Sequence, residues 1–577
     1  MNGAPVHARP STPGYASRRL YVEGPQLLPM ALLKKDASSE LINAVRDIEE
    51  RADECFKSLQ LLIHPSNIAI WSVLVGGIRR VEQQISQYGD NSPQLQSGLI
   101  NLSRSLPIAM KWAFDHGRRI SKLASRRWTA SLEAAVEEAI FVALQYSHFL
   151  SCLPLWHKDF FAAELISPTL VRFTLLGSGR IRQVSAYQKG FRPAEGHYKG
   201  VRAEKLKQTS QIETLFGQVL QNCQKTGVLR FEYDDPWDLW LALLPQYKDR
   251  VSGIVRRAES LSLGTFTLGE FKQFYSALLS ICAAHEYLCF LWGVRHGGYP
   301  IDSSLIIRSG HTWALTLSRL SGVSAEKCEA MVRDLTFDFS TSVDLHVHPI
   351  IPLDASTMNL AIAPQFPLHS RPDENILRVC SLLRPSDFDV TSLKKEPEFR
   401  ADLEKLGSPY LLQGPIALPH PAPDIDLLLT DEASSTIVIS ELKWIRKTVR
   451  PVERLSRDAD VLKGVGQLKE IRDFLTKHPN YLHSLGRLPR AITDYANIYY
   501  LLVARDHWIW VEPTKELAIV EFEPFSKALR RTEGLHFAMS DLLKYDWLPQ
   551  EGKNFRVQFD RATVNGVSLE SEVYYSI

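Results

Sequence analysis

Residues 436–444, with the sequence TIVISELKW, most constrain how this chain can fold. The first four residues are β-branched and predict a buried strand. Because successive side chains of a strand point to opposite faces, Glu441 and Lys443 share one face. Buried charges are costly unless they are paired or bind an ion. The segment therefore predicts either a strand end that reaches solvent with an ordinary Glu–Lys pair, or a functional site built into a sheet.

A second apolar run with acidic residues precedes this strand. Residues 424–430 read DIDLLLT, and the turn between the two runs is acidic and rich in serine, which predicts a hairpin. With a loop over residues 432–435, the register places Asp426 directly opposite Glu441. The Cβ atoms of such a pair lie roughly 5 Å apart, close enough for one shared metal ion. A loop longer by one residue would turn Asp426 to the other face.

Two carboxylates at this spacing repel each other unless a cation neutralises them. Oxygen ligands of this kind suit Mg²⁺, and Mn²⁺ can substitute. Lys443, on the same face, can position a water or help to deprotonate it for attack on phosphate. The residues therefore predict a metal-dependent hydrolytic site at Asp426, Glu441 and Lys443, with Asp424 as the alternative first carboxylate.

The pattern PDIDLLL followed by ISELKW resembles the PD-(D/E)xK nuclease superfamily, which has the restriction-endonuclease-like fold. That family places an Asp on one strand and a Glu-x-Lys on the next. The resemblance assigns these positions to Asp426, Glu441 and Lys443, and it covers only the C-terminal part of the chain. It implies a Mg²⁺ ion held by the two carboxylates and the Leu442 carbonyl. It also implies that Lys443 orients the attacking water.

The helix predicted before the hairpin extends the resemblance. Family members often begin with a helix that carries a Glu near the metal ions. The segment EPEFRADLEKLG offers Glu398 for this role, with Glu396 and Glu404 as alternatives, and Gly407 ends the helix.

The helix predicted after the Glu-x-Lys strand adds a second match. Many family members have a Gln there that points at the site, and KGVGQLKEI offers Gln467, with Lys463 one turn earlier. Exonuclease-like members have a Tyr four residues after that Gln, whereas this chain has Ile471. Endonuclease and exonuclease action both remain open.

The pattern along the 577 residues predicts a multidomain protein, with a mostly α-helical N-terminal half and a C-terminal α/β restriction-endonuclease-like domain. In that domain a central mixed sheet is flanked by helices. The expected regions are a disordered tail at 1–37, a predominantly helical part for recognition or regulation at 38–330, a Pro-rich connecting region at 331–384, the nuclease-like domain at 385–530 and a C-terminal extension at 531–577.

The charge balance, the cysteine content and the apolar runs of the sequence bear on where the protein is located and on whether its whole surface is basic. Lys and Arg total 67 against 65 Asp and Glu, so any basic surface has to be local. The seven cysteines form no CxxC pair, which favours reduced thiols and a cytoplasmic location. The most apolar run, residues 276–294, contains His285 and Glu286 and predicts a buried helix rather than a membrane span.

One basic segment, residues 111–128, interleaves cations with Trp112 and Trp128. Such a helix can follow a phosphate backbone, whereas the alternative is a solvated basic face with both tryptophans in the core. The nucleic-acid candidates are Lys111, Arg118, Arg119, Lys122, Arg126, Arg127 and, on the later helix, Lys463.

A competing metal motif occurs in VDLHVHP, residues 343–349. His346 and His348 resemble the His-x-His strand of amidohydrolases and related metal-dependent hydrolases, because two imidazoles on one strand face can chelate a metal. Such barrels need about 250 residues, more than the chain has left after His348. The alternative is a short edge strand with half-exposed histidines.

These patterns favour a Mg²⁺-dependent nuclease that hydrolyses phosphodiester bonds of nucleic acid, with DNA favoured by the resemblance. Helical modules joined to this nuclease fold resemble prokaryotic defence and restriction proteins. The alternative is a catalytically inactive nuclease-fold scaffold that binds nucleic acid or a protein, and the third possibility is the His-x-His hydrolase. A protein partner or a homo-oligomer is possible, and no membrane association is expected.

Overall fold

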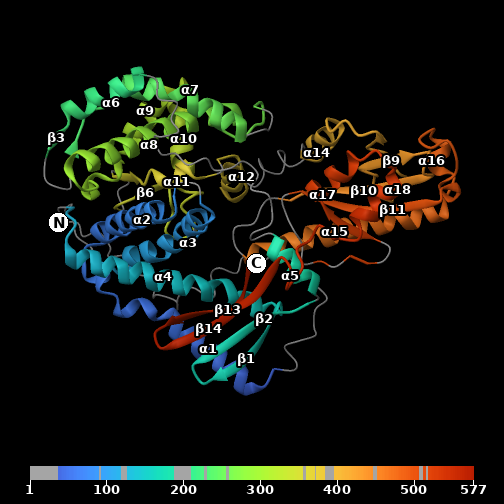
Figure 1. Cartoon of the computed structure of the whole chain (residues 1–577), viewed down its shortest axis with the longest axis horizontal. Coiled ribbons are helices and arrows are strands. Elements are labelled where there is room, and N and C mark those ends of the chain that lie inside the picture. Colours follow the sequence, from blue (N-terminus) through green and yellow to red (C-terminus); the bar gives the residue numbers. More distant parts are fainter. Residues whose placement is uncertain are drawn as a thin grey trace, which may run out of the picture.

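The structure is a computed structural model in which helical, mixed and all-β parts are distinct (Figure 1). It describes residues 37–89, 92–118, 126–177, 179–187, 210–225, 231–254, 259–342, 344–354, 359–370, 372–383, 395–445, 451–505, 511, 513–514 and 517–576. The predicted N-terminal tail therefore lies almost wholly outside the described residues.

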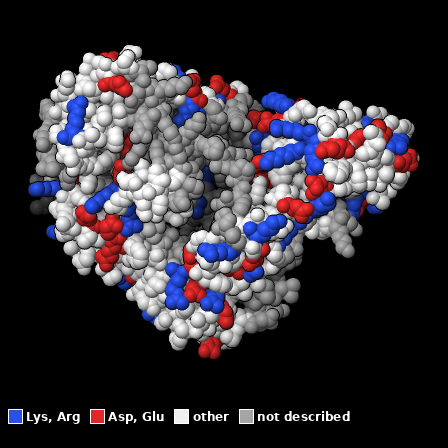
Figure 2. Space-filling model, in the orientation of Figure 1, with Lys and Arg blue, Asp and Glu red and all other residues white. Residues whose placement is uncertain are grey.

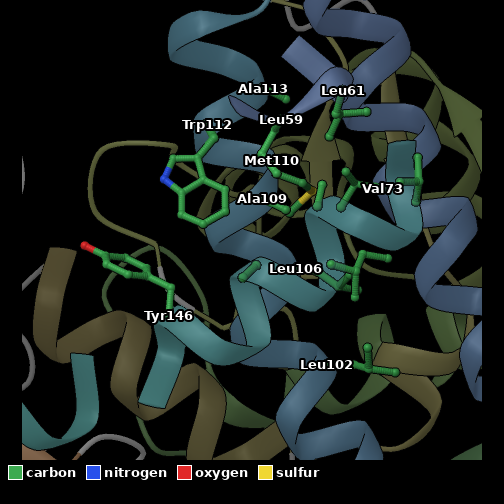
Figure 3. Close-up of a cluster of buried hydrophobic side chains, with 14 of the residues drawn as sticks. Leu59, Leu61, Val73, Leu102, Leu106, Ala109, Met110, Trp112, Ala113 and Tyr146 are labelled. Carbon is green, nitrogen blue, oxygen red and sulfur yellow. The ribbon is translucent and has the colours of Figure 1, made fainter. Parts of the chain in front are cut away.

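Four helices near the N-terminus build the first core. Ser38 caps α1 (Ser39–Asp53), since its side chain accepts a hydrogen bond from the Leu41 backbone N–H at 3.2 Å. α2 (Ser66–Tyr88), α3 (Pro93–His116) and α4 (Ala130–His157) pack against each other. Their leucine, valine and aromatic side chains meet in the cluster of Figure 3.

A second helical core follows along the chain (Figure 1). Its long central helix is α8 (Leu268–His296), which begins with a capping box formed by Thr267 and Glu270. The other members are α6 (Ser210–Asn222), α7 (Trp237–Ile254), α9 (Gly310–Ser321), α10 (Ala325–Asp334) and α12 (Pro372–Leu383).

The predicted connecting region, 331–384, packs as part of these helical cores. β6 (Ile350–Pro352) and β7 (Leu360–Ile362) form a three-stranded sheet with β5 (Ile306–Arg308) from the preceding region. Ile350 and Ile362 are buried in the second core, so this region is ordered by packing and not by its prolines alone.

The helices α4 and α8 are long and apolar enough to cross a membrane, judged by length and composition. Half of the apolar window of α4 and 67% of that of α8 are buried inside the protein. Core helices of globular proteins have the same composition, and the predicted buried helix at 276–294 lies within α8. None of the seven cysteines, which all lie in the described part of the chain, forms a disulfide.

One four-stranded sheet joins a hairpin from the N-terminal half with the C-terminal hairpin of the described chain (Figure 1). β1 (Phe161–Ser167) and β2 (Leu170–Leu175) form one hairpin, and β13 (Phe555–Val564) and β14 (Val567–Ser576) form another. β14 pairs in parallel with β2, which gives the order β1-β2-β14-β13. The C-terminal segment 531–577 therefore completes a sheet that starts in the N-terminal half.

A row of alternating charges crosses this sheet. Glu164, Arg172, Glu570 and Arg561 are register partners on successive strands. Glu570 accepts hydrogen bonds from Arg561 Nη2 at 2.6 Å and from Arg172 Nε at 2.9 Å. The bond from Arg561 is the largest influence on the pKa of the Glu570 carboxyl, and the net shift is downward although burial raises it.

We expect Glu570→Gln to lower the melting temperature at neutral pH and to have little effect in acid. Because the folded pKa of Glu570 lies below its unfolded value, its stabilisation is complete above the unfolded pKa and disappears as the pH falls through the folded pKa. Melting curves of wild type and variant from neutral pH to about pH 3 test this. Glu164→Gln, which removes an exposed carboxyl of the same row, is the control. A constant difference across this range would contradict the expectation.

The C-terminal α/β part contains the predicted central mixed sheet, with the strand order β12-β11-β10-β9-β8. β9 (Leu427–Asp431) is antiparallel to β8 (Leu411–Gln413) and to β10 (Thr436–Trp444). β11 (Asn497–Arg505) is parallel to β10 and to β12 (Ala518–Glu521). Residues 507–513, HWIWVEP, whose apolar and aromatic pattern also favours a strand, lie largely outside the described residues.

Helices cover both faces of this sheet, as the sequence predicts (Figure 1). α14 (Lys395–Glu404), α17 (Phe522–Leu529) and α18 (Leu535–Leu542) lie on the face that carries Val438. α15 (Pro451–Lys477) lies on the opposite face, with Ile439, and also packs against α4 of the helical part. Successive side chains of β10 lie alternately in the two clusters on the two faces, and this alternation assigns Glu441 and Lys443 to the α15 face.

The remaining short elements connect these parts. They are the 3₁₀ helices at Cys55–Ser58, Gln60–Ile63, Ile301–Ser303 and Ile492–Asp494, α5 (Gly179–Ala186), α11 (Gln365–Leu368), α16 (Tyr481–Ser484), β3 (Gln224–Lys225) and β4 (Phe231–Glu232).

Candidate functional site

The hairpin register predicted from the sequence is confirmed. Asp431 pairs with Thr436, and the antiparallel ladder continues to Leu427 opposite Ser440. The next step along the two strands brings Asp426 opposite Glu441. Asp431 stabilises the turn, because its carboxylate accepts hydrogen bonds from turn residues and from the first N–H of α18. Because these bonds fix the turn, they also fix the pairing register of β9 and β10. The register determines on which face of the sheet the Asp426 side chain lies.

Glu441 and Lys443 form a buried ion pair on the α15 face. Lys443 Nζ lies 2.6 Å from Glu441 Oε1. Glu441 is 2% exposed, and the Lys443 side chain is 16% exposed. The pair is therefore not a surface contact at a strand end, which was the simpler expectation. A carboxylate this deeply buried requires a cation nearby, which is either this ammonium group or a metal ion.

Asp426 lies beside this pair. Its Oδ2 atom accepts a hydrogen bond from the Leu442 backbone N–H at 2.9 Å. Its own carbonyl accepts a bond from Arg400 Nε of α14 at 3.0 Å. Gly414, with φ of +152°, lies so close that a Cβ there would stand 2.3 Å from the same carbonyl. Asp424, the alternative first carboxylate, is exposed.

The helix α15 crosses above the site, and Gly464 makes that approach possible. A Cβ at Gly464 would stand 2.6 Å from Leu502 Cδ1 and 3.0 Å from Lys443 Cε. Because β10 and β11 are parallel, α15 runs back along them, so Gln467 lies one turn from Gly464 in the direction of Glu441. Within the described residues, Gln467 Oε1 is buried and has no hydrogen-bond partner. The helix thus brings an available polar atom toward the carboxylates.

Substitution of Gly464 by Ala should disturb Lys443, although Ala is the better helix former. Helix propensity alone favours Ala by about 1 kcal/mol, whereas overpacking of a buried contact costs about 1–3 kcal/mol. We expect Gly464→Ala to lower the free energy of unfolding. Gly466→Ala in the same helix, where a Cβ meets no described atom within 4 Å, should raise it. Chemical denaturation measures both, and equal effects would contradict the close packing on Lys443.

The other predicted site residues are less clearly placed relative to Asp426, Glu441 and Lys443. Leu442 contributes the backbone N–H bound to Asp426, while its side chain is buried on the opposite face. Glu398 is half-buried on α14, which contacts the site through Arg400. Glu404 is exposed, and nothing is described of the Glu396 side chain. The structure therefore brings Asp426, Glu441, Lys443 and α15 together and leaves the helix Glu unassigned.

The predicted nucleic-acid residues of the segment 111–128 do not form one continuous described surface. Trp112 and Trp128 are buried in the first core, which is the alternative expected for this segment. Arg118 and Arg127 are exposed, Lys111 and Arg126 are half-buried, and Arg119 and Lys122 lie outside the described residues. Lys463 is exposed on α15. In Figure 2 basic and acidic side chains are interspersed over the α/β part, so charge alone does not mark a binding face.

The His-x-His segment does not form the strand expected in either interpretation. Residues 344–349 form a turn, in which the Asp344 carboxylate accepts the His346 backbone N–H at 2.9 Å. His348 is only 9% exposed, and burial, followed by the charge of Arg378, lowers its pKa to about 4. Among the described residues, no group of three or more His, Cys, Asp or Glu side chains is arranged to hold a metal. The strand prediction is wrong because the backbone turns around Asp344.

Two buried carboxylates of the described α/β part, Glu521 and Asp458 of α15, are not among the site residues predicted from the sequence. Glu521 ends β12, is 1% exposed and lies on the α15 face. Glu521 is the register partner of Ala504 on β11, and Ala504 is the register partner of Lys443 on β10. The signal of Glu521 in the sequence is the same as that of Glu441, an acidic residue at the end of an apolar strand run, ELAIVEF.

The geometry offers two carboxylates and a lysine on adjacent strands, with a buried amide oxygen from the covering helix. Hard oxygen donors in this arrangement can bind a divalent cation, and the lysine can donate hydrogen bonds to an anion beside it. No family model, no curated protein and no solved structure matches this chain. The chemistry of the site therefore rests on its own residues.

Proposed function

We propose that the chain is a metal-dependent phosphodiesterase that hydrolyses nucleic acid, with DNA favoured over RNA, and that its α/β part has the restriction-endonuclease-like fold. The observation that carries the proposal is the ion pair of Glu441 with Lys443 beside Asp426, whose carboxylate accepts the N–H of Leu442, the residue between them. The sheet, its antiparallel first hairpin and the parallel pair joined by α15 support the fold assignment.

The residues fit a divalent cation of the Mg²⁺ class. Glu441 is buried and already balanced by a cation, and Asp426 presents its second carboxylate beside the same strand. Oxygen donors are the ligands that Mg²⁺ and Mn²⁺ prefer. In this proposal Asp426, Glu441 and the Leu442 carbonyl hold the ion. When bound, the ion polarises the phosphate and lowers the pKa of a coordinated water.

The protein groups divide the remaining tasks. Lys443 orients the attacking water and stabilises the negative charge that develops on the phosphate. A metal ion held by Glu441 would balance the charge that Lys443 now balances, so the ammonium group would be available to the water and to the phosphate. Gln467, on α15, can accept a hydrogen bond from a water through its Oε1, which is buried without a described partner. Glu398 remains the proposed helix carboxylate.

A specific observation also supports the second candidate function, a catalytically inactive scaffold that binds nucleic acid or protein. Both carboxylates already have protein partners, Lys443 for Glu441 and the Leu442 N–H for Asp426. Such a closed network can serve the fold alone. The two functions differ in one measurable respect, because the scaffold binds without cutting.

The deciding experiment incubates the full chain with linear duplex DNA, circular duplex DNA, single-stranded DNA and RNA, each with Mg²⁺ or with EDTA. We expect cleavage of DNA in Mg²⁺ and none in EDTA. Loss of the circular substrate indicates an endonuclease, and loss of linear DNA alone indicates an exonuclease. Glu441→Ala should remove cleavage, and added Mn²⁺ should partly restore it in Glu441→Asp. Binding of any substrate without cleavage would favour the scaffold.

A further inference from the structure

The strand β13 is an edge of the four-stranded sheet, because among the described strands it pairs only with β14. A two-residue loop, Asn565 and Gly566, joins the two strands, and both residues have positive φ, as a tight hairpin turn requires. The flanking residues Val564 and Val567 are therefore a hydrogen-bonded pair. Because such pairs alternate along an antiparallel ladder, the even-numbered residues of β13 bond to β14. The N–H and C=O groups of its odd-numbered residues point outward.

Two hydrogen bonds confirm this direction and mark the ends of the open edge. Gln145 Oε1 of α4 accepts the outward N–H of Thr563 at 3.0 Å. At the other end, the Gly552 N–H donates to the outward carbonyl of Phe555 at 2.8 Å. Between these ends, the outward backbone groups that have no hydrogen-bond partner in the described structure belong to Val557, Phe559 and Arg561. The edge therefore presents a short row of donors and acceptors.

The side chains of this edge carry complementary charges. Charges on an edge strand commonly prevent pairing with another chain. On β13, however, Arg556 and Asp560 are both exposed, have opposite signs and lie on the same face, four residues apart. Tyr575 of β14 donates a hydrogen bond to Asp560 at 3.0 Å, which holds the carboxylate at the edge. A carboxylate has about four acceptor positions, so this one can also bind a cation from another chain.

A second copy of β13 complements this edge in one register. Two copies related by a two-fold axis run antiparallel, and their outward odd-numbered residues must face each other. When the axis passes through Gln558, Val557 lies opposite Phe559 of the second copy. Arg556 then lies opposite Asp560, and the symmetry forms this ion pair twice, with Cβ atoms about 5 Å apart. An axis through Asp560 opposes two like charges, and an axis through Val557 or Phe559 pairs no opposite charges.

We propose that β13 is a self-pairing edge, through which two copies of this chain form a closed dimer with one sheet continuous across the two-fold axis. Three open residues give a contact smaller than a standard interface of roughly 1,600 Å², so we expect a dissociation constant on the order of 10 µM. The inference does not depend on the proposed nuclease function, because β13 lies in a different sheet from Asp426 and Glu441.

The test is sedimentation velocity of the full chain at concentrations from about 1 to 100 µM, where we expect a monomer to become a dimer. Arg556→Asp and Asp560→Arg should each be monomeric alone, because each opposes like charges across the axis. An equimolar mixture of the two variants should restore the dimer, because every like-charged chain then meets a chain of the opposite charge. Recovery in the mixture also shows that both variants are folded.

A matched pair of variants at Val557 tests the backbone contribution. Val557→Pro removes an outward N–H and keeps the hydrogen bonds to β14, so it should be monomeric. Val557→Thr keeps the N–H and should dimerise. If Val557→Pro does not fold, the mixed charge-reversal variants give the decision.

Three results would overturn the inference. The first is a wild type that stays monomeric up to about 100 µM, ten times the expected dissociation constant. The second is a dimer that neither charge reversal weakens. The third is growth beyond a dimer, because this indicates pairing of β13 with the opposite edge, β1, of the next copy in an open chain.

Discussion

Replacement of Lys443 by Ala should reduce Mg²⁺-dependent cleavage by about a hundredfold or more while DNA binding changes little. The ammonium group acts on the attacking water and on the charge of the transition state, so its loss lowers kcat rather than affinity. Affinity for nucleic acid comes from many backbone contacts spread over the protein. Single-turnover cleavage and a filter-binding titration separate the two quantities.

The same variant should be destabilised when no metal is present. Glu441 is 2% exposed, and a buried ion pair that loses one partner typically costs about 3–5 kcal/mol. Mg²⁺ should restore part of that stability, because a cation then balances Glu441 again. Thermal melts with Mg²⁺ and with EDTA check this. Lys469→Ala, which removes an exposed cation of α15, is the control and should affect neither stability nor kcat strongly.

A folded Lys443→Ala protein that cleaves at the wild-type rate would reject the mechanism. If the variant melts below the assay temperature, Lys443→Met gives the same comparison with the aliphatic stem retained. The stem matters because it packs against the Gly464 position of α15.

The second large effect concerns the choice between Asp426 and Asp424. We expect Asp426→Asn to abolish metal-dependent cleavage and to weaken Mg²⁺ binding, while Asp424→Asn leaves both unchanged. Only Asp426 lies next to Glu441 in the hairpin register, whereas Asp424 is exposed. Isothermal titration with Mg²⁺ or Mn²⁺ and the cleavage assay measure the two properties.

The choice of Asn separates metal binding from folding. Asp426 Oδ2 accepts the Leu442 N–H, and a buried N–H left without an acceptor costs about 1–3 kcal/mol. The amide oxygen of Asn keeps this acceptor, so Asp426→Asn should melt near the wild-type temperature. Asp426→Ala should melt lower. Loss of cleavage in Asp424→Asn, with activity retained in Asp426→Asn, would move the first metal ligand to Asp424.

The local sequence pattern was sufficient to predict the strands β9 and β10 of the α/β part. The β-branched run at 436–444 became β10 with the predicted bounds, and the four-residue turn set the register of β9 against it. Both are short-range properties, since side-chain alternation and turn length are written in adjacent residues. The strand predicted from the pattern of residues 344–349 was wrong. There the Asp344 carboxylate accepts a backbone N–H bond, which favours a turn over a strand.

The sequence by itself determined which residues share the hairpin face, Asp426, Glu441 and Lys443, because these lie within one local unit. Only the tertiary structure decided what surrounds them. Gly464 reaches Lys443 through packing of α15, and Glu521 joins its row through two parallel strand pairings. The C-terminal hairpin likewise meets β2, where Arg172 and Glu570 pair across 398 residues. Such contacts form when the whole apolar surface is buried, and no local pattern specifies which distant strand becomes the neighbour.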